Sequence, residues 1–338
     1  SGVYTLGMKS DDGCRVYVDG KKVIDAWTEH SVQMDEAMIK LEAGKTYKLQ
    51  VEYFDNGGDC FAGLYWKAPS AGSQNVLARF GDAGKVAEEC DVTVAVLGIN
   101  KSIEREGQDR FSLELPVDQQ EFIKELYKVN PNTVVVLVAG SSMAVNWMDE
   151  NVPAILNAWY PGEQGGNAVA EVLFGDYNPG GRLPLTYYNS LDEIPAFDNY
   201  FVKGRTYQYF EGQPLYEFGY GLSYTKFRYK SKGVNVEQDT VKVSFEVSNT
   251  GKYDGDEVTQ VYVKYPETGT YMPLKQLHGF KRVHIKKGKT SKVTIGVPKK
   301  DLRYWDEQER KFVTPKGEYT FMVGASSDDI KFRETVGL

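Results

Sequence analysis

The sequence has little of what metal sites, disulfide scaffolds and Ser-His-Asp triads are made from. Only three of its 338 residues are cysteines and three are histidines. The cysteines show neither zinc-ligand spacing nor a disulfide framework. Cys14 and Cys60 could pair, although buried free thiols are the expected state for these two and for Cys90. The histidines lie far apart, at His30, His278 and His284. We therefore expect no zinc site, no triad and no cofactor.

A long apolar run and an excess of positive charge are also missing. No stretch approaches the roughly 20 apolar residues of a membrane-spanning helix. The chain does not open on a charged-then-apolar secretory segment, so any export signal lies outside this sequence. The net charge is −7, which argues against a nucleic-acid partner. In the one basic cluster, residues 281–292, the basic residues alternate with others in a way typical of the solvent-exposed face of a β-hairpin. We expect a globular protein with neither a membrane nor a nucleic acid as partner.

Aromatic residues, in contrast, are abundant. They make up 13% of the chain, and 23 of them are tyrosines. Aromatic faces stack on sugar rings, but tyrosine also fills β-sandwiches. This composition favours a carbohydrate ligand only slightly.

Residues 1–68 show an all-β pattern. Short alternating segments run from Val3 to Trp66, and Asp19-Gly20 is a hairpin signal between two of them. These features predict a β-sandwich. The first strand begins almost at Ser1, so we expect a partial sandwich with an edge that would normally be paired.

The pattern changes after a linker at residues 68–72. Over residues 76–224, strands and helices alternate as in an α/β layered domain. We expect a helix in the second half of 78–90. The other expected elements are strands at 92–98, 133–140 and 154–160 and helices at 115–129 and 162–174. A Gly-, Pro- and Tyr-rich stretch, 178–224, should wrap this domain. Residues 227–338 return to short strands and predict a small immunoglobulin-like sandwich.

The loop after the apolar run 92–98 carries the candidate chemistry. It contains Glu104, Glu106, Asp109 and Arg110, and it leaves the end of what we expect to be a buried strand, where α/β enzymes place an acid or base. An extended backbone would put both glutamates on one side, and their repulsion would raise the pKa of one of them. In the structural alternative, Asp109 and Arg110 lock the loop by an ion pair while both glutamates are solvated. On composition alone the structural alternative is favoured.

Longer motifs change this weighting. The loop reads EREGQDR and is followed by LELP at 113–116 and by Gln119-Gln120. Further along, residues 158–166 read AWYPGEQGG, residues 173–184 read LFGDYNPGGRLP, and residues 218–225 read FGYGLSYT. Together these blocks resemble the C-terminal half of glycoside hydrolase family 3, and their length and order make the resemblance specific.

The resemblance covers essentially the whole chain. Residues 1–68 look like part of a protective-antigen-like sandwich, residues 76–224 like the α/β sandwich domain, and residues 227–338 like a fibronectin type III-like domain. It implies a retaining, exo-acting β-glucosidase or β-xylosidase whose substrate is a β-linked oligosaccharide. In the family the acid/base glutamate commonly precedes a Gly-x-Asp-Arg stretch, which corresponds to Glu106, with Glu104 as the rival. Asp109 and Arg110 would support the loop.

The family's nucleophile is missing from this sequence. It is an aspartate on an N-terminal (β/α)8 barrel, whereas a retaining glycosidase needs two carboxyl groups about 5 Å apart. We therefore expect the chain to be inactive alone and to need a barrel segment of the same enzyme, possibly as a separate chain. The alternatives are a non-catalytic carbohydrate-binding protein and a purely structural fragment. By resemblance only, the expected location is periplasmic or secreted.

Three other features carry weaker expectations. The turn at 161–166 lacks the Lys-Ser/Thr pair of a phosphate-binding loop, so a tight strand-to-helix turn is expected. Calcium ligands could come from Asp11-Asp12, or from Asp55-Asn56 with Asp59, but Asp and Asn are also the ordinary residues of turns, and turns are what we expect there. Asp55 and Phe61 are candidate contacts for a sugar beyond the scissile bond. Trp159 and Tyr160 could stack on sugar, but we expect both side chains to lie in the core.

Overall fold

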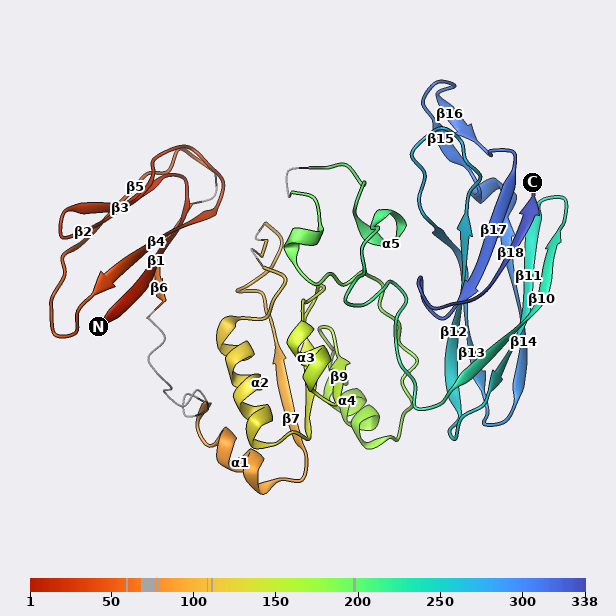
Figure 1. The fold of residues 1–338 in the computed structure, drawn as a ribbon, viewed down its shortest axis with the longest axis horizontal. Helices are drawn as coiled ribbons and strands as arrows, with labels where there is room; N and C mark the ends of the chain where they lie inside the picture. Colours follow the sequence, from red (N-terminus) through yellow and green to blue (C-terminus); the bar gives the residue numbers. More distant parts are fainter. Residues whose placement is uncertain (59, 68–76, 78–79, 108, 111, 197–198) are drawn as a thin grey trace. The chain divides into compact units, whose positions relative to one another are not determined.

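The computed structural model describes residues 1–338 except 59, 68–76, 78–79, 108, 111 and 197–198. It divides into two compact units, Ser1–Asp82 and Ala83–Leu338 (Figure 1). The expected linker at 68–72 lies outside the described residues. The domain limits expected at 68, 76, 224 and 227 stay predictions.

The first unit is built from strands alone. It contains β1 (Gly2–Asp11), β2 (Cys14–Val18), β3 (Lys21–Ala26), β4 (Gln33–Leu41), β5 (Leu49–Tyr53) and β6 (Phe61–Lys67). These strands form two antiparallel sheets in the orders β4-β1-β6 and β3-β2-β5. Met8, Cys14, Val16 and Ile24 form the buried cluster of this unit. The cluster is small, since every second residue of β4 and most residues of β6 are exposed.

The second unit begins with a three-stranded parallel sheet in the order β7-β8-β9. The elements of this part are α1 (Ala83–Glu89), β7 (Thr93–Gly98), α2 (Val117–Val129), β8 (Thr133–Val138), α3 (Asn146–Asn151), β9 (Ala154–Asn157) and α4 (Gly165–Phe174). Apolar Ile123 and Leu126, three apart on α2, are buried, as the helical spacing predicts. Figure 1 shows β7 running from α1 toward the loop of residues 99–115.

The β7 strand is covered on one face only. Ala95 and Leu97 are 5% and 7% exposed, whereas Val94 and Val96 are 45% and 65% exposed. The expectation that this whole strand is buried was therefore wrong. The cause is its position at an edge of the described sheet, while central β8 is mostly buried.

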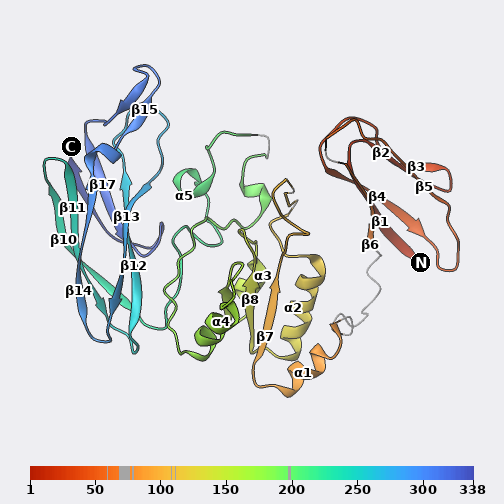
Figure 2. The ribbon, with the colours of Figure 1, turned by 180° about the vertical axis from the view of Figure 1, so that it is seen from behind.

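The end of the chain forms a sandwich of two antiparallel sheets. One sheet has the order β10-β11-β14 and the other β13-β12-β17-β18. Their bounds are β10 (Phe227–Val236), β11 (Thr240–Asn249), β12 (Gly255–Lys264), β13 (Gln276–Ile285), β14 (Thr290–Pro298), β17 (Glu318–Gly324) and β18 (Ile330–Gly337), with a small ribbon of β15 (Tyr304–Asp306) and β16 (Lys311–Val313). Seen from behind in Figure 2, the two sheets lie face to face. Fully buried Val243, Phe245, Val261 and Phe321 lie in the core between them.

The segment between the two parts contacts both of them. It holds two short helices, η2 (Leu191–Glu193) and α5 (Thr206–Tyr209). Arg182 donates to Glu257 on β12 over 2.9 Å, and only 8% and 3% of these two side chains are exposed. Tyr216 donates to Asp149 on α3 over 2.6 Å. The segment therefore joins the parallel sheet to the sandwich.

Candidate active site

The candidate site starts where β7 ends, at Gly98. The Gln119 side chain of α2 accepts from the Gly98 N–H and donates to its carbonyl, both over 2.8 Å. Gly98 has a φ of +154°, and a Cβ there would lie 1.8 Å from the Val138 carbonyl oxygen. Only glycine allows this close approach of β7 to β8. The loop therefore leaves the sheet from a fixed point.

The loop then curls rather than continuing extended. The backbone N–H groups of Ile103 and Glu104 donate to the Asn100 carbonyl over 2.9 and 3.2 Å. The Asn100 side chain accepts from the N–H and the hydroxyl of Ser102. The arrangement considered for an extended backbone, with Glu104 and Glu106 on one side, is therefore not formed, because this turn rotates the first glutamate back toward the sheet.

Glu104 is held by two partners. Its Oε2 lies 2.7 Å from Arg110 Nε and accepts the Ser141 hydroxyl over 2.6 Å. The exposed fractions are 20% for the Glu104 side chain and 9% for the Arg110 side chain. Both partners belong to the protein itself. The Glu104 carboxylate is therefore engaged in contacts that hold the loop.

Arg110 also holds the loop that follows β8. Its Nη2 donates to the Ser141 hydroxyl over 2.8 Å and to the Ser142 carbonyl over 2.7 Å. Its Nη1 donates to the Leu113 carbonyl over 3.4 Å. The expected ion pair between Asp109 and Arg110 was wrong, because in the described part of the chain the acid that pairs with Arg110 is Glu104. Neighbouring side chains diverge, whereas the turn brings position 104 back to position 110.

Glu106 has the opposite environment in the same loop. It is exposed, and the next residue, Gly107, turns the chain with a φ of +73°. Among the residues that the structure describes, none forms an ion pair or hydrogen bond with the Glu106 carboxylate. Asp109 is exposed as well. Of the two glutamates, Glu106 is thus the one that is accessible to a ligand.

Sequence reasoning missed Ser141 and Gln119 as members of this site. Ser141 follows the apolar run of β8 directly, and the carboxyl ends of parallel strands meet at one edge of a sheet. That position could have suggested its role. Nothing in the sequence around Gln119 distinguishes its inward-facing amide from that of its neighbour.

The two remaining candidate residues belong to the first unit. Asp55 accepts from the Gly57 N–H over 2.9 Å in a local turn. Phe61 starts β6, opposite Asp11 of β1, and Lys9 Nζ lies 5.3 Å from the centre of its ring. Asp59 lies outside the described residues.

The structure also bears on the metal and cysteine expectations. In the described ranges, no group of three or more His, Cys, Asp or Glu residues could hold a metal ion. The Asp12 carboxylate accepts from the N–H groups of His30 and Asn56, which lowers its pKa. The three cysteines are free, but only Cys14 is buried. The expectation of buried thiols was wrong for Cys60 and Cys90, which are exposed on a loop and just after a helix.

A cavity of about 430 Å³ lies beside β9 rather than at the glutamates. Apolar and aromatic side chains line most of it, among them Trp159, Tyr187, Tyr216 and Tyr220. Trp159 has a φ of +55°, a region that bulky residues rarely adopt. Trp159, considered above for sugar stacking, lines this cavity, but the candidate catalytic and loop-support residues Glu104, Glu106, Asp109 and Arg110 do not. We therefore locate the candidate chemistry in the loop after β7.

A parallel α/β sheet with an exposed carboxyl group beyond its carboxyl edge, followed by a β-sandwich, defines a multidomain protein with one α/β part and one all-β part. Comparisons with known proteins give the family. The profile of the Glycosyl hydrolase family 3 C-terminal domain matches residues 17–224, and that of the Fibronectin type III-like domain matches residues 257–327. The chain belongs to glycoside hydrolase family 3. The resemblance and the fold class predicted from the sequence are confirmed.

Relatives with assigned activities support this assignment. The chain is 34% identical to a xylan 1,4-beta-xylosidase of Xylanibacter ruminicola, over 97% of this chain and 39% of that protein. It is 33% identical to a periplasmic beta-glucosidase of Salmonella typhimurium, over 82% of this chain and 38% of that protein. The crystal structure of a beta-glucosidase from Kluyveromyces marxianus with glucose superposes with a TM-score of 0.72 at 30% identity, over 100% of this chain and 42% of that one. The chain thus spans about two fifths of the length of these relatives.

Within the part of the chain that the structure describes, no helix is both long and apolar enough to cross a membrane.

Proposed function

We propose that this chain forms the C-terminal portion of a retaining, exo-acting β-glucosidase or β-xylosidase and supplies its acid/base, Glu106. The observation that carries the proposal is the contrast within one loop. Glu104 is held by Arg110 and Ser141, whereas Glu106 is exposed and follows the same strand. Asp109 and Arg110 shape the loop. The substrate is a β-linked oligosaccharide that loses one terminal sugar in each reaction.

The proposed chemistry uses Glu106 twice. As an acid, its carboxyl proton passes to the glycosidic oxygen while a carboxylate elsewhere attacks the anomeric carbon and the bond to the leaving group breaks. As a base, the Glu106 carboxylate then takes a proton from water. The water oxygen attacks the anomeric carbon and displaces the other carboxylate, which was attached there in the first step. A proton donor must be accessible to the leaving group, and the exposure of Glu106 meets this requirement.

The opposing carboxylate lies outside this chain in our proposal. We assign it to an aspartate on an N-terminal barrel segment of the same enzyme, on the same polypeptide or on a separate one. The share of each relative that this chain spans is consistent with such a segment. Retention needs both carboxyl groups, so the chain alone should be inactive. From the similarity to the Salmonella enzyme we propose a periplasmic or secreted location.

The test uses aryl β-xyloside and aryl β-glucoside with the chain alone and with the complete enzyme. We expect hydrolysis by the complete enzyme only, and a product that first appears as the β-anomer in proton NMR. An α-anomer as first product would contradict the retaining mechanism. Hydrolysis by the chain alone would contradict the assignment of the nucleophile.

The second candidate is a carbohydrate-binding module without catalysis, which the high tyrosine content favours. Titration of the chain with glucose, xylose and cellobiose separates the two. Clear binding of these small sugars supports the module, and its absence supports the dependent half-enzyme. Intact-mass measurement of the native sample shows whether a second polypeptide accompanies the 38.0 kDa chain.

A further inference from the structure

Residues 199–203 form an exposed aromatic tip, here called the tip, in the segment between the parallel sheet and the sandwich. The exposed fractions are 91% for Tyr200, 80% for Phe201 and 57% for Val202. Three adjacent apolar residues with this exposure are unusual on a protein surface, and such patches mark interaction sites.

The tip is held in a defined conformation by Arg205. The guanidinium Nη2 donates to the carbonyls of Pro195, Ala196 and Asn199 over 3.2, 2.9 and 2.9 Å. The Phe201 N–H donates to the Asn199 side chain over 3.0 Å. These bonds connect Asn199, next to the exposed rings, with Phe201 and Arg205.

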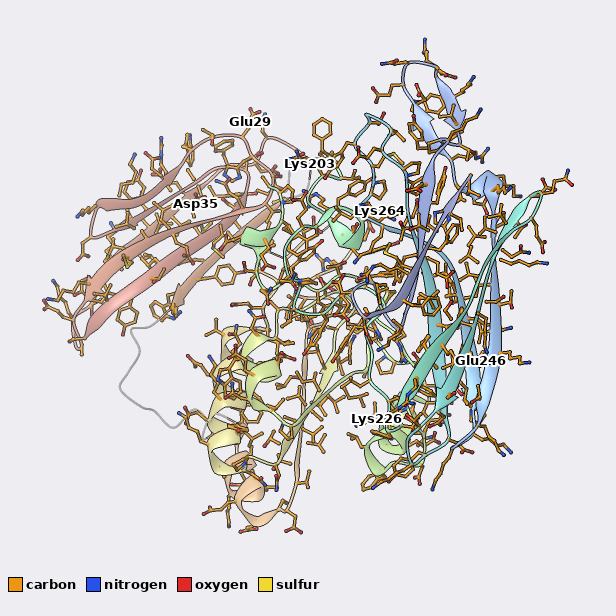
Figure 3. All side chains as sticks on the ribbon, turned by 45° about the vertical axis from the view of Figure 1, so that its right-hand side comes forward. Glu29, Asp35, Lys203, Lys226, Glu246 and Lys264 are labelled. Carbon is orange, nitrogen blue, oxygen red and sulfur yellow. The ribbon has the colours of Figure 1, made fainter. Side chains whose placement is uncertain are left out.

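A second aromatic group lies beside the tip. Lys203, labelled in Figure 3, places its Nζ 5.5 Å from the centre of the Tyr271 ring. Tyr271 stacks on Tyr209 with ring centres 5.3 Å apart and planes 21° apart, and 51% of Tyr271 is exposed. The surface therefore combines aromatic rings with an ammonium group and phenolic hydroxyls.

The tip lies at the same end of the parallel sheet as the Glu106 loop. Figures 1 and 2 show the loop after β7 and the segment directly before α5 both beyond the carboxyl end of β7. Contacts connect the two regions. The backbone of Glu114, which follows the Glu106 loop, forms an isolated β-bridge with the backbone of Ala144. Two residues after Ala144, the Asn146 side-chain amide donates to the Asn189 carbonyl over 3.0 Å.

We propose that the tip, with Tyr271, binds the distal part of a β-1,4-linked pyranose chain, beyond the sugar unit that is cleaved. A pyranose ring has an apolar C–H face, which fits an aromatic ring, and a rim of hydroxyls, which fits the Lys203 ammonium and the tyrosine hydroxyls. The choice of a carbohydrate rests on the proposed function and on the position of the tip at the Glu106 end of the sheet. The proposal concerns chains of several units, because the tip would contact sugars beyond the unit that is cleaved.

The test is affinity electrophoresis of the 338-residue chain in native gels that contain soluble arabinoxylan or mixed-linkage β-glucan. We expect one of these polymers to retard the chain, and the Tyr200→Ala/Phe201→Ala double variant to bind it about tenfold more weakly, because two rings lose their apolar contact. Tyr253→Ala is the matched control, since Tyr253 is 60% exposed on a loop between β11 and β12. It should bind like the unchanged chain.

Two outcomes overturn the proposal. One is the absence of retardation by either polymer, and the other is equal retardation of the double variant, which would locate the binding elsewhere. Hydroxyl-radical labelling of the complete enzyme without polysaccharide tests a protein partner. Full protection of Tyr200 there would mean that another part of the enzyme covers the tip, which also overturns the proposal. None of these readouts depends on hydrolysis, so they can fail or succeed independently of the role of Glu106.

Discussion

Arg110 Nε and Glu104 Oε2 lie 2.7 Å apart, across a loop that begins and ends at the same edge of the sheet. This ion pair distinguishes two glutamates that lie two residues apart in one loop. It takes Glu104 into a structural network with Ser141 and leaves Glu106 exposed. The relationship explains how one loop can hold one carboxylate in place and leave another accessible.

The first prediction concerns the strength of this pair. Arg110→Met leaves a mostly buried Glu104 carboxylate unpaired and should lower the free energy of unfolding of the second unit by about 2–4 kcal/mol. In a double-mutant cycle with Glu104→Gln, we expect a coupling energy of about 1–3 kcal/mol, measured by urea unfolding. Additive effects would show that the two side chains do not interact in solution.

The second prediction concerns Gly98, where the loop leaves β7. Gly98→Ala forces β7 away from the Val138 carbonyl, which should cost about 1–3 kcal/mol of stability and also displace the Glu106 loop. Gly162→Ala is the matched control, because a Cβ there meets open space. Its cost should stay within about 0.5 kcal/mol. Equal thermal unfolding midpoints for the two variants would contradict the close approach of β7 and β8.

The elements around this loop were predictable from sequence to different degrees. The periodicity over α2 and the apolar run of β8 are long enough to specify their type, and the structure has Val117–Val129 and Thr133–Val138 there. Helix α3 was missed, because the six residues Asn146–Asn151 are too few for a helical pattern to emerge. The strand expected at 154–160 ends at Asn157, since the left-handed backbone at Trp159 turns the chain away from the sheet.

The site was predictable in position but not in detail. A carboxylate-rich loop after an apolar strand identifies the region, because such loops lie at the ligand-binding edge of α/β sheets. The partner of Arg110 depends on how the loop curls, and that curl depends on Asn100 and on contacts with the loop after β8. These are tertiary interactions, which no local pattern specifies.

The third prediction concerns the buried pair that joins the connecting segment to the sandwich. Arg182→Met should cost about 3–5 kcal/mol, because it leaves the Glu257 carboxylate buried and without its cation. Burial raises the pKa of Glu257 although Arg182 and Tyr229 favour its ionised form. Lys232→Met is the control, since 42% of the Lys232 side chain is exposed and its pair with Glu246, labelled in Figure 3, is a surface pair worth about 1 kcal/mol or less. A similar loss for both variants in chemical unfolding would refute the special role of the buried pair.

The fourth prediction is a pH dependence that arises from His278. Burial lowers the pKa of His278 below its ordinary value of 6.5, although the negative charge of Asp301 acts to raise it. The Tyr265 hydroxyl lies 2.9 Å from its Nε2. When the pH falls below 6.5, the unfolded state binds a proton before the folded state does, so the free energy of unfolding must decrease. Urea unfolding between about pH 5 and pH 7.5 should show this decrease, and His278→Gln should reduce it.

His284→Gln provides the control for this measurement, because 59% of the His284 side chain is exposed. We expect it to change the acid sensitivity less than His278→Gln does. An unchanged pH profile in the His278 variant would contradict a buried, neutral imidazole.

The most direct measurement of the role of Glu106 compares Glu106→Gln and Glu104→Gln in the complete enzyme over a series of aryl glycosides of increasing leaving-group pKa. Glu106→Gln should lower kcat/KM by about 10²–10⁴-fold for poor leaving groups and far less for good ones, because only poor leaving groups need a proton. Glu104→Gln should be milder and should not depend in this way on the leaving group. The reverse ranking, with Glu104→Gln showing the steep dependence, would contradict the assignment of Glu106 as the acid/base.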